Sequence, residues 1–251
     1  IVARPTTTKN KSLPSVSVII PCRNERGNIE DAVRRMPRFC KEIELLFVEG
    51  DSIDGTAQEI DRVIHLFPDW NIRSLQQSGK GKGDAVRQGF AATQNNVLMI
   101  LDADLTVSPE ALPQFYDALV AGKGEFINGS RLIYPMDPKA MRFLNLLANR
   151  AFSVLFSWLL NQRLTDTLCG TKVLSKRNYE KIAASRTYFG EFDPFGDYDL
   201  LFGASKLNLK MAEVPIRYAA RTYGETQISR FSDGWLLIRM VFFAWRKMKA
   251  F

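Results

Sequence analysis

The stretch that decides the fold is the apolar run Val97-Leu98-Met99-Ile100-Leu101, which ends in the two acids of Asp102-Ala103-Asp104. Five apolar residues in a row predict a strand buried on both faces, as in a parallel sheet covered by helices. Ligands bind such sheets at the carboxyl ends of the strands. The i, i+2 spacing lets two carboxylates share one divalent cation, and oxygen ligands of this kind suit Mg²⁺ or Mn²⁺ carrying a diphosphate. The pair is not specific on its own, because aspartate is also common in solvated turns.

The sequence around this run alternates between short apolar segments and helical patterns. β-branched or apolar runs predict strands, and apolar residues at helical spacing predict helices. The predicted strands cover residues 16–21, 44–48, 72–75, 97–101 and 125–128, and the predicted helices cover 28–36, a stretch from 56, 84–93 and 109–120. This alternation indicates an α/β fold with a mostly parallel, doubly wound sheet.

Composition limits the class of protein and its partners. The 251 residues are 46% hydrophobic and carry a formal net charge of +7, which implies anionic partners such as nucleotides, nucleic acid or an acidic membrane surface. Three cysteines without metal-ligand spacing favour a reducing, cytosolic setting. The first residues are polar and rich in proline and threonine, so we expect a linker over 1–14 and no signal peptide.

Two helical segments are denser in apolar and aromatic residues than the rest of the chain. The first covers 142–160, and its aromatic side chains could lie equally well in the core or at a membrane interface. The second, 235–251, interleaves aromatic residues with lysine and arginine, which favours a basic amphipathic helix lying in the membrane interface. The longest uncharged apolar stretch, 151–162, is shorter than the ~20 residues that span a bilayer.

Four polar clusters follow the ends of predicted strands and should meet at one edge of the sheet. They are Pro21-Cys22-Arg23-Asn24-Glu25, Glu49-Gly50-Asp51-Ser52, Asp102-Ala103-Asp104 and Gly129-Ser130-Arg131. Between them, Gly79-Lys80-Gly81-Lys82-Gly83 is a flexible cationic loop that can approach phosphate closely. Its spacing matches neither the P-loop of ATPases nor the G-x-G-x-x-G of dinucleotide-binding dehydrogenases, which argues against both classes.

Further motifs follow these clusters in order along the chain. The whole set is Ser17-Val18-Ile19-Ile20-Pro21, Asn24-Glu25, Val48 to Ser52, Asp54-Gly55-Thr56, Gly81 to Phe90, Asp102-Ala103-Asp104, Gly129-Ser130-Arg131, Asp166 to Lys172, Glu213 to Ile216 and Arg221 to Thr226. The set resembles glycosyltransferase family 2, and in particular its polyprenol-phosphate branch, which includes dolichol-phosphate mannose synthase and dolichol-phosphate glucosyltransferase. The resemblance extends from Ser15 to about Gly234, and the order of the motifs makes it specific.

The resemblance implies a GT-A-type nucleotide-diphospho-sugar transferase fold over 15–234, followed by the basic helix 235–251. It implies an inverting, metal-dependent transfer of mannose or glucose from GDP-mannose or UDP-glucose to a polyprenyl or dolichyl phosphate. Such an enzyme would be cytoplasmic and peripheral on the cytoplasmic face of a membrane. Its cations would lie beside acids at strand ends, which disfavours a nucleic acid partner.

By position, the resemblance assigns a role to each candidate site residue. The nucleotide sugar would contact Pro21, Arg23, Glu25, Val48, Gly50, Asp51, Lys82, Asp102, Ala103, Asp104 and Arg131. Asp102 and Asp104 would hold the metal. The catalytic groups would be Asp104, Arg131 and Arg221, and the acceptor phosphate would contact Lys172, Arg221 and Gln227.

The chain departs from the family pattern at three places. The usual Asp-Asp-Gly-Ser is Glu49-Gly50-Asp51-Ser52, so the carboxylate that contacts the base is displaced by one residue. A common glutamine is Thr106, and an expected lysine is Gln227.

Two other functions remain open. The first is a family 2 transferase acting on a hydroxyl of a lipid or polysaccharide, with Asp197 or Asp199 as the base. The second is a non-catalytic protein, either a membrane-associated scaffold or a basic nucleic-acid-binding protein.

Overall fold

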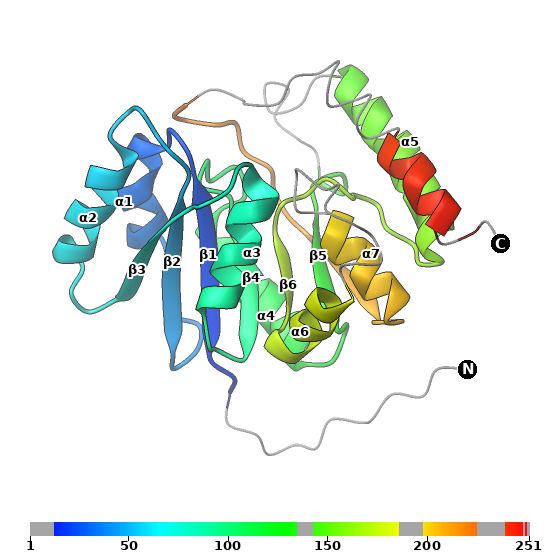
Figure 1. Ribbon diagram of the computed structural model, residues 1–251, viewed down its shortest axis with the longest axis horizontal. Coiled ribbons are helices and arrows are strands. Elements are labelled where there is room, and N and C mark those ends of the chain that lie inside the picture. Colours follow the sequence, from blue (N-terminus) through cyan, green and yellow to red (C-terminus); the bar gives the residue numbers. More distant parts are fainter. Residues whose placement is uncertain (1–12, 135–142, 186–197, 225–238, 248, 250–251) are drawn as a thin grey trace.

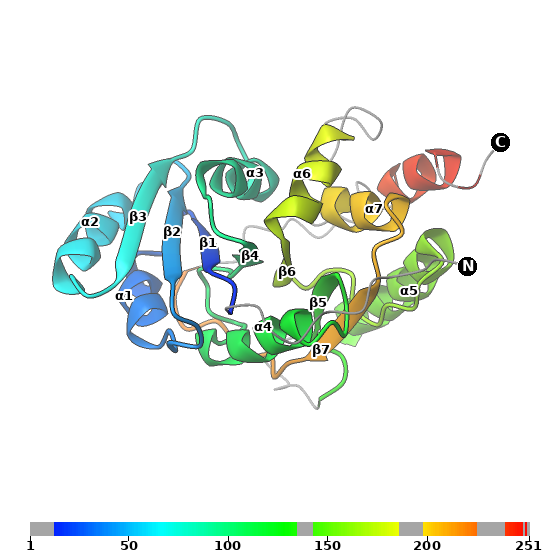
Figure 2. The same cartoon turned by 90° about the horizontal axis from the view of Figure 1, so that it is seen from below.

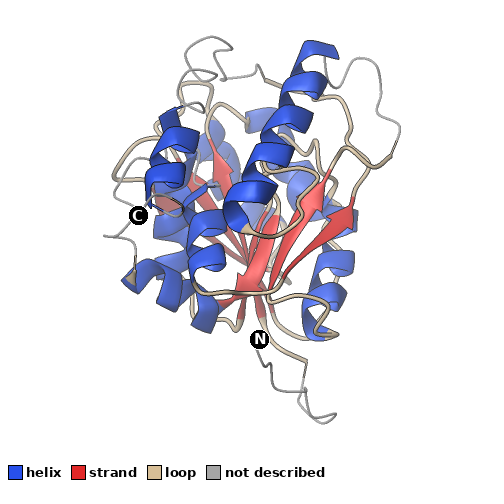
Figure 3. Cartoon of the chain, turned by 90° about the vertical axis from the view of Figure 1, so that its right-hand side faces the viewer, coloured by secondary structure: helices blue, strands red, loops and turns tan. Residues whose placement is uncertain are grey.

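The protein is built on one seven-stranded sheet with helices on both faces (Figures 1 and 3). The structure is a computed structural model that describes residues 13–134, 143–185, 198–224, 239–247 and 249. The elements are β1 (Val16–Cys22), α1 (Arg26–Arg34), β2 (Ile43–Glu49), α2 (Thr56–Leu66), β3 (Asn71–Gln76), α3 (Lys82–Ala92), β4 (Val97–Ile100), a 3₁₀ turn (Pro109–Ala111), α4 (Leu112–Val120), β5 (Phe126–Ser130), α5 (Phe143–Leu160), β6 (Lys172–Ser175), α6 (Lys176–Ala184), α7 (Tyr198–Lys206) and β7 (Met211–Pro215). Residues 239–247 form a further helix.

The strand order is β3-β2-β1-β4-β6-β5-β7. The first four strands of this order are parallel, and β7 is parallel to β5. Strand β6 runs antiparallel to both β4 and β5, so the carboxyl ends of β4 and β5 lie on the same edge. The predicted α/β fold with a mostly parallel sheet is therefore confirmed. The reversed strand β6 was not predicted, because its direction depends on pairing with β4 and β5, which lie far from it in the sequence.

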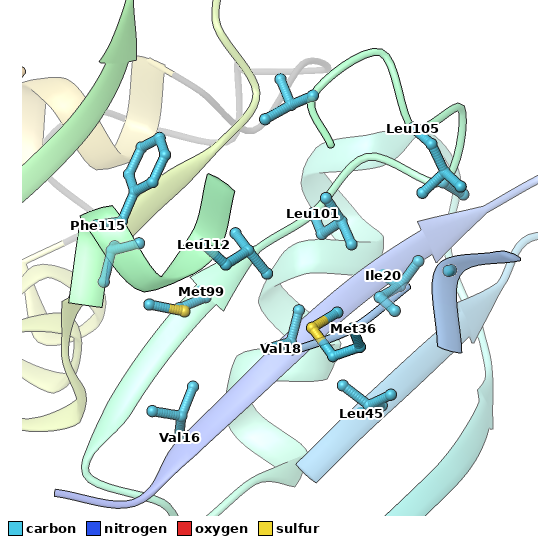
Figure 4. Packing of buried hydrophobic residues seen from close by; sticks show 14 of the residues in the cluster. Val16, Val18, Ile20, Met36, Leu45, Met99, Leu101, Leu105, Leu112 and Phe115 are labelled. Carbon is cyan, nitrogen blue, oxygen red and sulfur yellow. The ribbon is translucent and has the colours of Figure 1, made fainter. Parts of the chain in front are cut away.

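The strands at the centre of the sheet are buried on both faces, as the apolar run in β4 predicts. In β1, Val16, Val18 and Ile20 pack with residues of α1, α2 and α4 (Figure 4). Ile19 faces the other way, into a cluster with Ile100 and residues of α3, α5, α6 and α7. Full burial of one such side chain contributes roughly 1.5–3 kcal/mol relative to exposure. The two clusters hold the strand ends in place and so position the edge where the polar residues lie.

The predicted helix boundaries differ from the observed ones by a few residues. Helix α1 begins two residues earlier than predicted, and the predicted helix 109–120 is a 3₁₀ turn followed by α4. Within the described ranges, no helix is both long and apolar enough to cross a bilayer. The predicted linker, apart from residues 13 and 14, and parts of the predicted helix 235–251 lie outside the described residues, so the predicted domain boundaries stay predictions.

Candidate active site at the carboxyl edge of the sheet

Two carboxylates follow β4, and each holds a cation from a distant part of the chain. Asp102 Oδ1 lies 2.6 Å from Nζ of Lys82, the first residue of α3. Asp104 Oδ2 accepts a 2.7 Å hydrogen bond from Nη2 of Arg221, which follows β7. Both carboxylates remain partly exposed, with 26% and 15% of their side-chain surfaces accessible. The strand end therefore presents two charged, solvent-accessible acids, as the sequence predicts.

The carboxylate of Asp104 is oriented by the backbone turn that follows it. Its Oδ1 accepts hydrogen bonds from the Thr106 amide at 3.1 Å and from Thr106 Oγ1 at 2.8 Å. Leu105, between them, has a left-handed φ of 52°, a conformation that costs a residue with a side chain about 1–2 kcal/mol. Thr106 thus replaces the family's glutamine with a residue that fixes Asp104 and leaves Oδ2 toward Arg221.

Asp102 is ionised more readily than an ordinary aspartate. Burial opposes its ionisation, but the charges of Lys82 and, further away, Lys172 and Arg131 outweigh burial and lower its pKa. The backbone of Gly170 packs against this ion pair, because a Cβ at Gly170 would overlap Asp102 and Lys82. A larger residue at position 170 would therefore require the two charged side chains to shift.

Arg221 also reaches Glu25, at the start of α1. Its Nη1 lies 3.3 Å from Glu25 Oε1, while Asn28 Nδ2 donates to Glu25 Oε2 at 2.7 Å. Burial raises the pKa of Glu25 to about 7, although the Asn28 hydrogen bond and the charge of Arg221 act in the opposite direction. Arg221 therefore bridges the ends of β1 and β4.

Arg221 belongs to residues 216–224, which we term the crossing segment because they run over the carboxyl edge from β7 toward α1. The segment is drawn in orange in Figure 1. Its Ala219 amide donates to the Thr106 carbonyl at 3.0 Å, and its Tyr223 hydroxyl donates to Asp54 Oδ2 at 3.2 Å. The Tyr223 ring packs directly on Gly27. These contacts hold Arg221 over the acids.

Arg131, at the end of β5, is held by a buried acid. Its Nε and Nη2 donate to the two carboxylate oxygens of Asp166 at 2.6 and 2.9 Å, and its amide donates to Oδ2 at 3.1 Å. The guanidinium also lies 5.1 Å from the ring of Tyr218. Arg131 lowers the pKa of Asp166 against the effect of burial. The sequence did not predict this pair, because nothing in the local pattern connects the two residues.

The structure brings Lys172 into the interior rather than onto an open surface. Its side chain is fully buried at the start of β6, and its Nζ donates to the Cys169 carbonyl. Its charge nevertheless acts on Asp102. Asp199 is a buried residue of α7. Gln227 and Asp197, the two other predicted residues of this half, lie outside the described residues.

The ends of β1 and β2 lie side by side and bring the predicted nucleotide-binding residues together. The Asn24 amide donates to Ser52 Oγ at 2.9 Å, and Asn24 Oδ1 accepts from the Ile53 amide at 2.9 Å. Asn24 and Asp51 both have left-handed φ angles, near 56° and 52°. Strained turns of this kind cluster at functional sites. The predicted residues at these ends and beside β4 are Pro21, Arg23, Glu25, Val48, Gly50, Asp51 and Ala103, of which Val48 and Ala103 are buried and Arg23 and Asp51 are exposed.

The donor set at β4 fits a divalent cation bound mainly by a substrate. In the described part of the chain, no three or more histidine, cysteine, aspartate or glutamate side chains cluster as a metal site. Mg²⁺ is commonly held by only one or two carboxylates together with substrate phosphates. Asp102 and Asp104 are two such carboxylates. Their oxygens are already paired with the positive charges of Lys82 and Arg221.

This fold, with acids at the end of a central strand and cations around them, defines an enzyme class: glycosyltransferases of the GT-A architecture. The chain belongs to glycosyl transferase family 2, whose sequence model matches residues 17–182. The resemblance inferred from the motifs is therefore confirmed.

Several characterised proteins are similar to this chain in sequence. Polyprenol monophosphomannose synthase of Mycolicibacterium smegmatis is 28% identical over 84% of this chain and 80% of its own length. Dolichol-phosphate mannosyltransferase of Saccharomyces cerevisiae is 33% identical over 41% of this chain and 40% of its own length. The protein of that name from Pyrococcus furiosus is 28% identical over 85% of this chain and 59% of its length. The chain thus spans less than two thirds of two of these relatives.

Solved structures share the fold at low sequence identity. Glucosyl-3-phosphoglycerate synthase from Mycobacterium tuberculosis, in complex with Mn²⁺, UDP and phosphoglyceric acid, superposes with a TM-score of 0.67 at 18% identity. The match covers 94% of this chain and 79% of that one. The likeness supports the GT-A fold.

Proposed function

We propose that this protein transfers a hexose, mannose or glucose, from a nucleotide diphosphate sugar to a polyprenyl or dolichyl phosphate with inversion at the sugar. The observation that carries the proposal is the pair Asp102 and Asp104, each held against a cation at the end of β4. The names of the sequence relatives support the acceptor class. GDP-mannose and UDP-glucose are the two donors that we propose.

Asp102 and Asp104 would hold Mg²⁺ or Mn²⁺ together with the donor diphosphate. The cation would supply a positive charge that stabilises the negative charge growing on the leaving nucleoside diphosphate. Thr106 contributes by fixing one oxygen of Asp104, so that the other is aimed toward the ligand. Lys82, which is paired with Asp102 in this structure, would contact a donor phosphate.

The acceptor requires positioning more than a base. A phosphomonoester is largely dianionic at pH 7, because its second pKa is about 6. In the proposed reaction an acceptor phosphate oxygen forms a bond to the anomeric carbon while the bond from that carbon to the diphosphate breaks. Arg221 is the cation best placed to hold the acceptor, since it lies partly exposed over Asp104. Buried Lys172 would act at longer range.

We place the enzyme, again as a proposal, on the cytoplasmic face of a membrane. Helix α5 and the helix 239–247 lie together, since Lys249 Nζ donates to Asn161 Oδ1 at 2.6 Å and lies 5.5 Å from the Trp158 ring. Among the residues of these helices whose side chains the structure describes, the exposed large apolar ones are Val154, Leu155, Trp158, Phe242 and Trp245. Cationic residues beside an exposed aromatic face match an anionic lipid surface.

The test is release of nucleoside diphosphate from GDP-mannose or UDP-glucose, measured with Mn²⁺ and a short-chain polyprenyl phosphate. Asp104→Asn should lower turnover at least about 100-fold, because it removes a carboxylate that would hold the cation, and the cation would stabilise the negative charge of the leaving group. Asp117→Asn, on the exposed face of α4, should leave turnover unchanged. Undiminished metal-dependent turnover in Asp104→Asn would refute the proposal.

Further arms of the same assay separate the alternatives. Turnover with a lipid or polysaccharide hydroxyl, and none with polyprenyl phosphate, would favour a hydroxyl-directed transferase with Asp197 or Asp199 as base. Absence of any nucleotide binding would favour a non-catalytic scaffold.

A further inference from the structure

Gln77, the residue after β3, fills the space left by the missing side chain of Gly50. A Cβ at Gly50 would lie 2.7 Å from Gln77 Oε1 and 3.8 Å from Cβ of Arg23. Position 50 is also where the family pattern has a carboxylate and this chain has none. A neutral amide oxygen from a neighbouring strand therefore stands at the end of β2.

The amide of Gln77 can adopt only one orientation. Its Nε2 donates to the Gly81 carbonyl at 2.9 Å and to Asp84 Oδ2 at 2.9 Å, which uses both of its hydrogens. Asp84 is itself held by Gln88 Nε2. A flipped amide would bring Oε1 against a carbonyl and a carboxylate, so the network assigns Oε1 to the side facing Gly50. Gln77 thus presents a fixed hydrogen-bond acceptor.

The strand order indicates which part of a nucleotide would reach this acceptor. With the diphosphate at β4, the rest of the nucleotide must extend along the edge in one direction. On the β6 side, the buried Arg131–Asp166 pair occupies the end of β5. On the other side lie β1, β2 and β3, at a usual spacing of about 4.8 Å per strand. The ribose then lies over β1 and the base comes to the ends of β2 and β3.

We propose that Gln77 reads the nucleobase of the donor, by accepting a hydrogen bond at Oε1 from the ring N–H of uracil or guanine. Cytosine and adenine carry an unprotonated ring nitrogen at the corresponding position. That nitrogen is itself a hydrogen-bond acceptor, so it would face Gln77 Oε1 with no hydrogen between the two atoms. An unmatched polar pair in a desolvated site is disfavoured. This inference rests on the proposed function, and it adds a residue to the donor site and names the chemistry of the base.

The experiment is calorimetric titration of UDP, CDP, GDP and ADP with Mn²⁺ present, on the intact protein. The unsubstituted protein should bind UDP at least about tenfold more tightly than CDP, or GDP at least about tenfold more tightly than ADP. A difference between UDP and CDP would identify the base as uracil, and a difference between GDP and ADP would identify it as guanine. Gln77→Met should bring that ratio close to one, chiefly by weakening the preferred nucleotide. Gln114→Met, at an exposed position of α4, should leave the ratio unchanged.

A second variant tests whether an effect of Gln77→Met arises only from a misfolded loop. Gln77→Ala combined with Gly50→Asp returns a carboxylate to β2 and removes the side chain that would collide with it, so the ratio should recover. The assignment would be overturned if the Gln77→Met variant kept the same affinity ratio, or if it bound all four nucleotides more weakly by the same factor. Either result would leave the proposed function intact. Failure of the unsubstituted protein to bind any of the four would overturn the proposed function as well.

Discussion

Glu25 is shielded from water beneath Arg221, and its pKa of about 7 lies above the ordinary value of 4.5. Between these values the folded protein retains a proton that the unfolded chain has lost. Stability must therefore fall as the pH rises through this range, by at most about 1.4 kcal/mol per pH unit. Above pH 7 the Glu25 carboxylate is charged in both states, and the slope disappears.

We predict that Glu25→Gln removes this slope. The free energy of unfolding, measured in urea at pH 5 and pH 7.5, should decline in the unsubstituted protein and less in the variant. Glu110→Gln is the matched control, because Arg35 lowers the pKa of Glu110 to about 2 and only a small fraction of a proton is exchanged there above pH 5. Equal slopes in the unsubstituted protein and Glu25→Gln would contradict the prediction.

Single residues also show where the sequence is informative about the site and where it is not. Asp102 and Asp104 were predicted because their position after an apolar strand is a local pattern. Arg131 was predicted as a phosphate ligand, whereas the structure pairs its guanidinium with Asp166, 35 positions away. Removing one member of such a buried pair costs about 3–5 kcal/mol. A role of Arg131 toward the donor stays a prediction.

At the scale of elements, the two helices with exposed aromatic residues bear on the proposed contact with a membrane. The predicted helix 142–160 is observed as α5, and part of 235–251 is observed as the helix 239–247. Each helix buries one side in the core. The buried residues include Phe156 and Leu159 of α5, and Met240 and Ala244 of the helix 239–247. The sequence left open whether α5 faces the core or the membrane interface. Its apolar residues are divided between the core and the surface.

We predict that Phe242→Ser combined with Trp245→Ser weakens binding to anionic vesicles roughly tenfold, because it removes aromatic surface from the membrane interface. Cosedimentation with phosphatidylcholine vesicles, with and without phosphatidylglycerol, would measure this loss. Leu66→Ser, on exposed α2, should not change sedimentation. Equal cosedimentation of the double variant and the unsubstituted protein would show that these helices do not contact lipid.

At the scale of the whole molecule, the first half of the sheet was predictable and the second half much less so. Strands β1, β2 and β4 consist mainly of apolar residues buried on both faces, and the helices between them have clear periodicity. Strand β6 is short, and its direction depends on pairing with β4 and β5. The site likewise depends on contacts between halves. The sequence therefore predicted the acids and their cations Lys82 and Arg221, but not which acid each cation pairs with.

The charge balance at the site predicts cooperation between metal and nucleotide. Mn²⁺ alone would compete with Lys82 and Arg221 for the acids, whereas a bound diphosphate would give Lys82 a new partner. At 100 times the dissociation constant, bound nucleotide stabilises the fold by about 2.7 kcal/mol, or roughly 5–10 °C in Tm for a chain of this size. Thermal unfolding should show a joint shift larger than the sum of the separate shifts. A merely additive shift, or the same excess in Asp104→Asn, would contradict this expectation.

The crossing segment has a consequence for folding. Arg221 meets Asp104 and Glu25, which lie 117 and 196 positions earlier in the chain. Contacts this remote require closure of the longest loops, and loop closure slows folding. The acids and the sheet around them can assemble from neighbouring segments, but their guanidinium partner arrives only with residues 216–224. Competence to transfer sugar is therefore acquired late, and a partly folded chain with an intact β1–β4 core is expected to bind no acceptor.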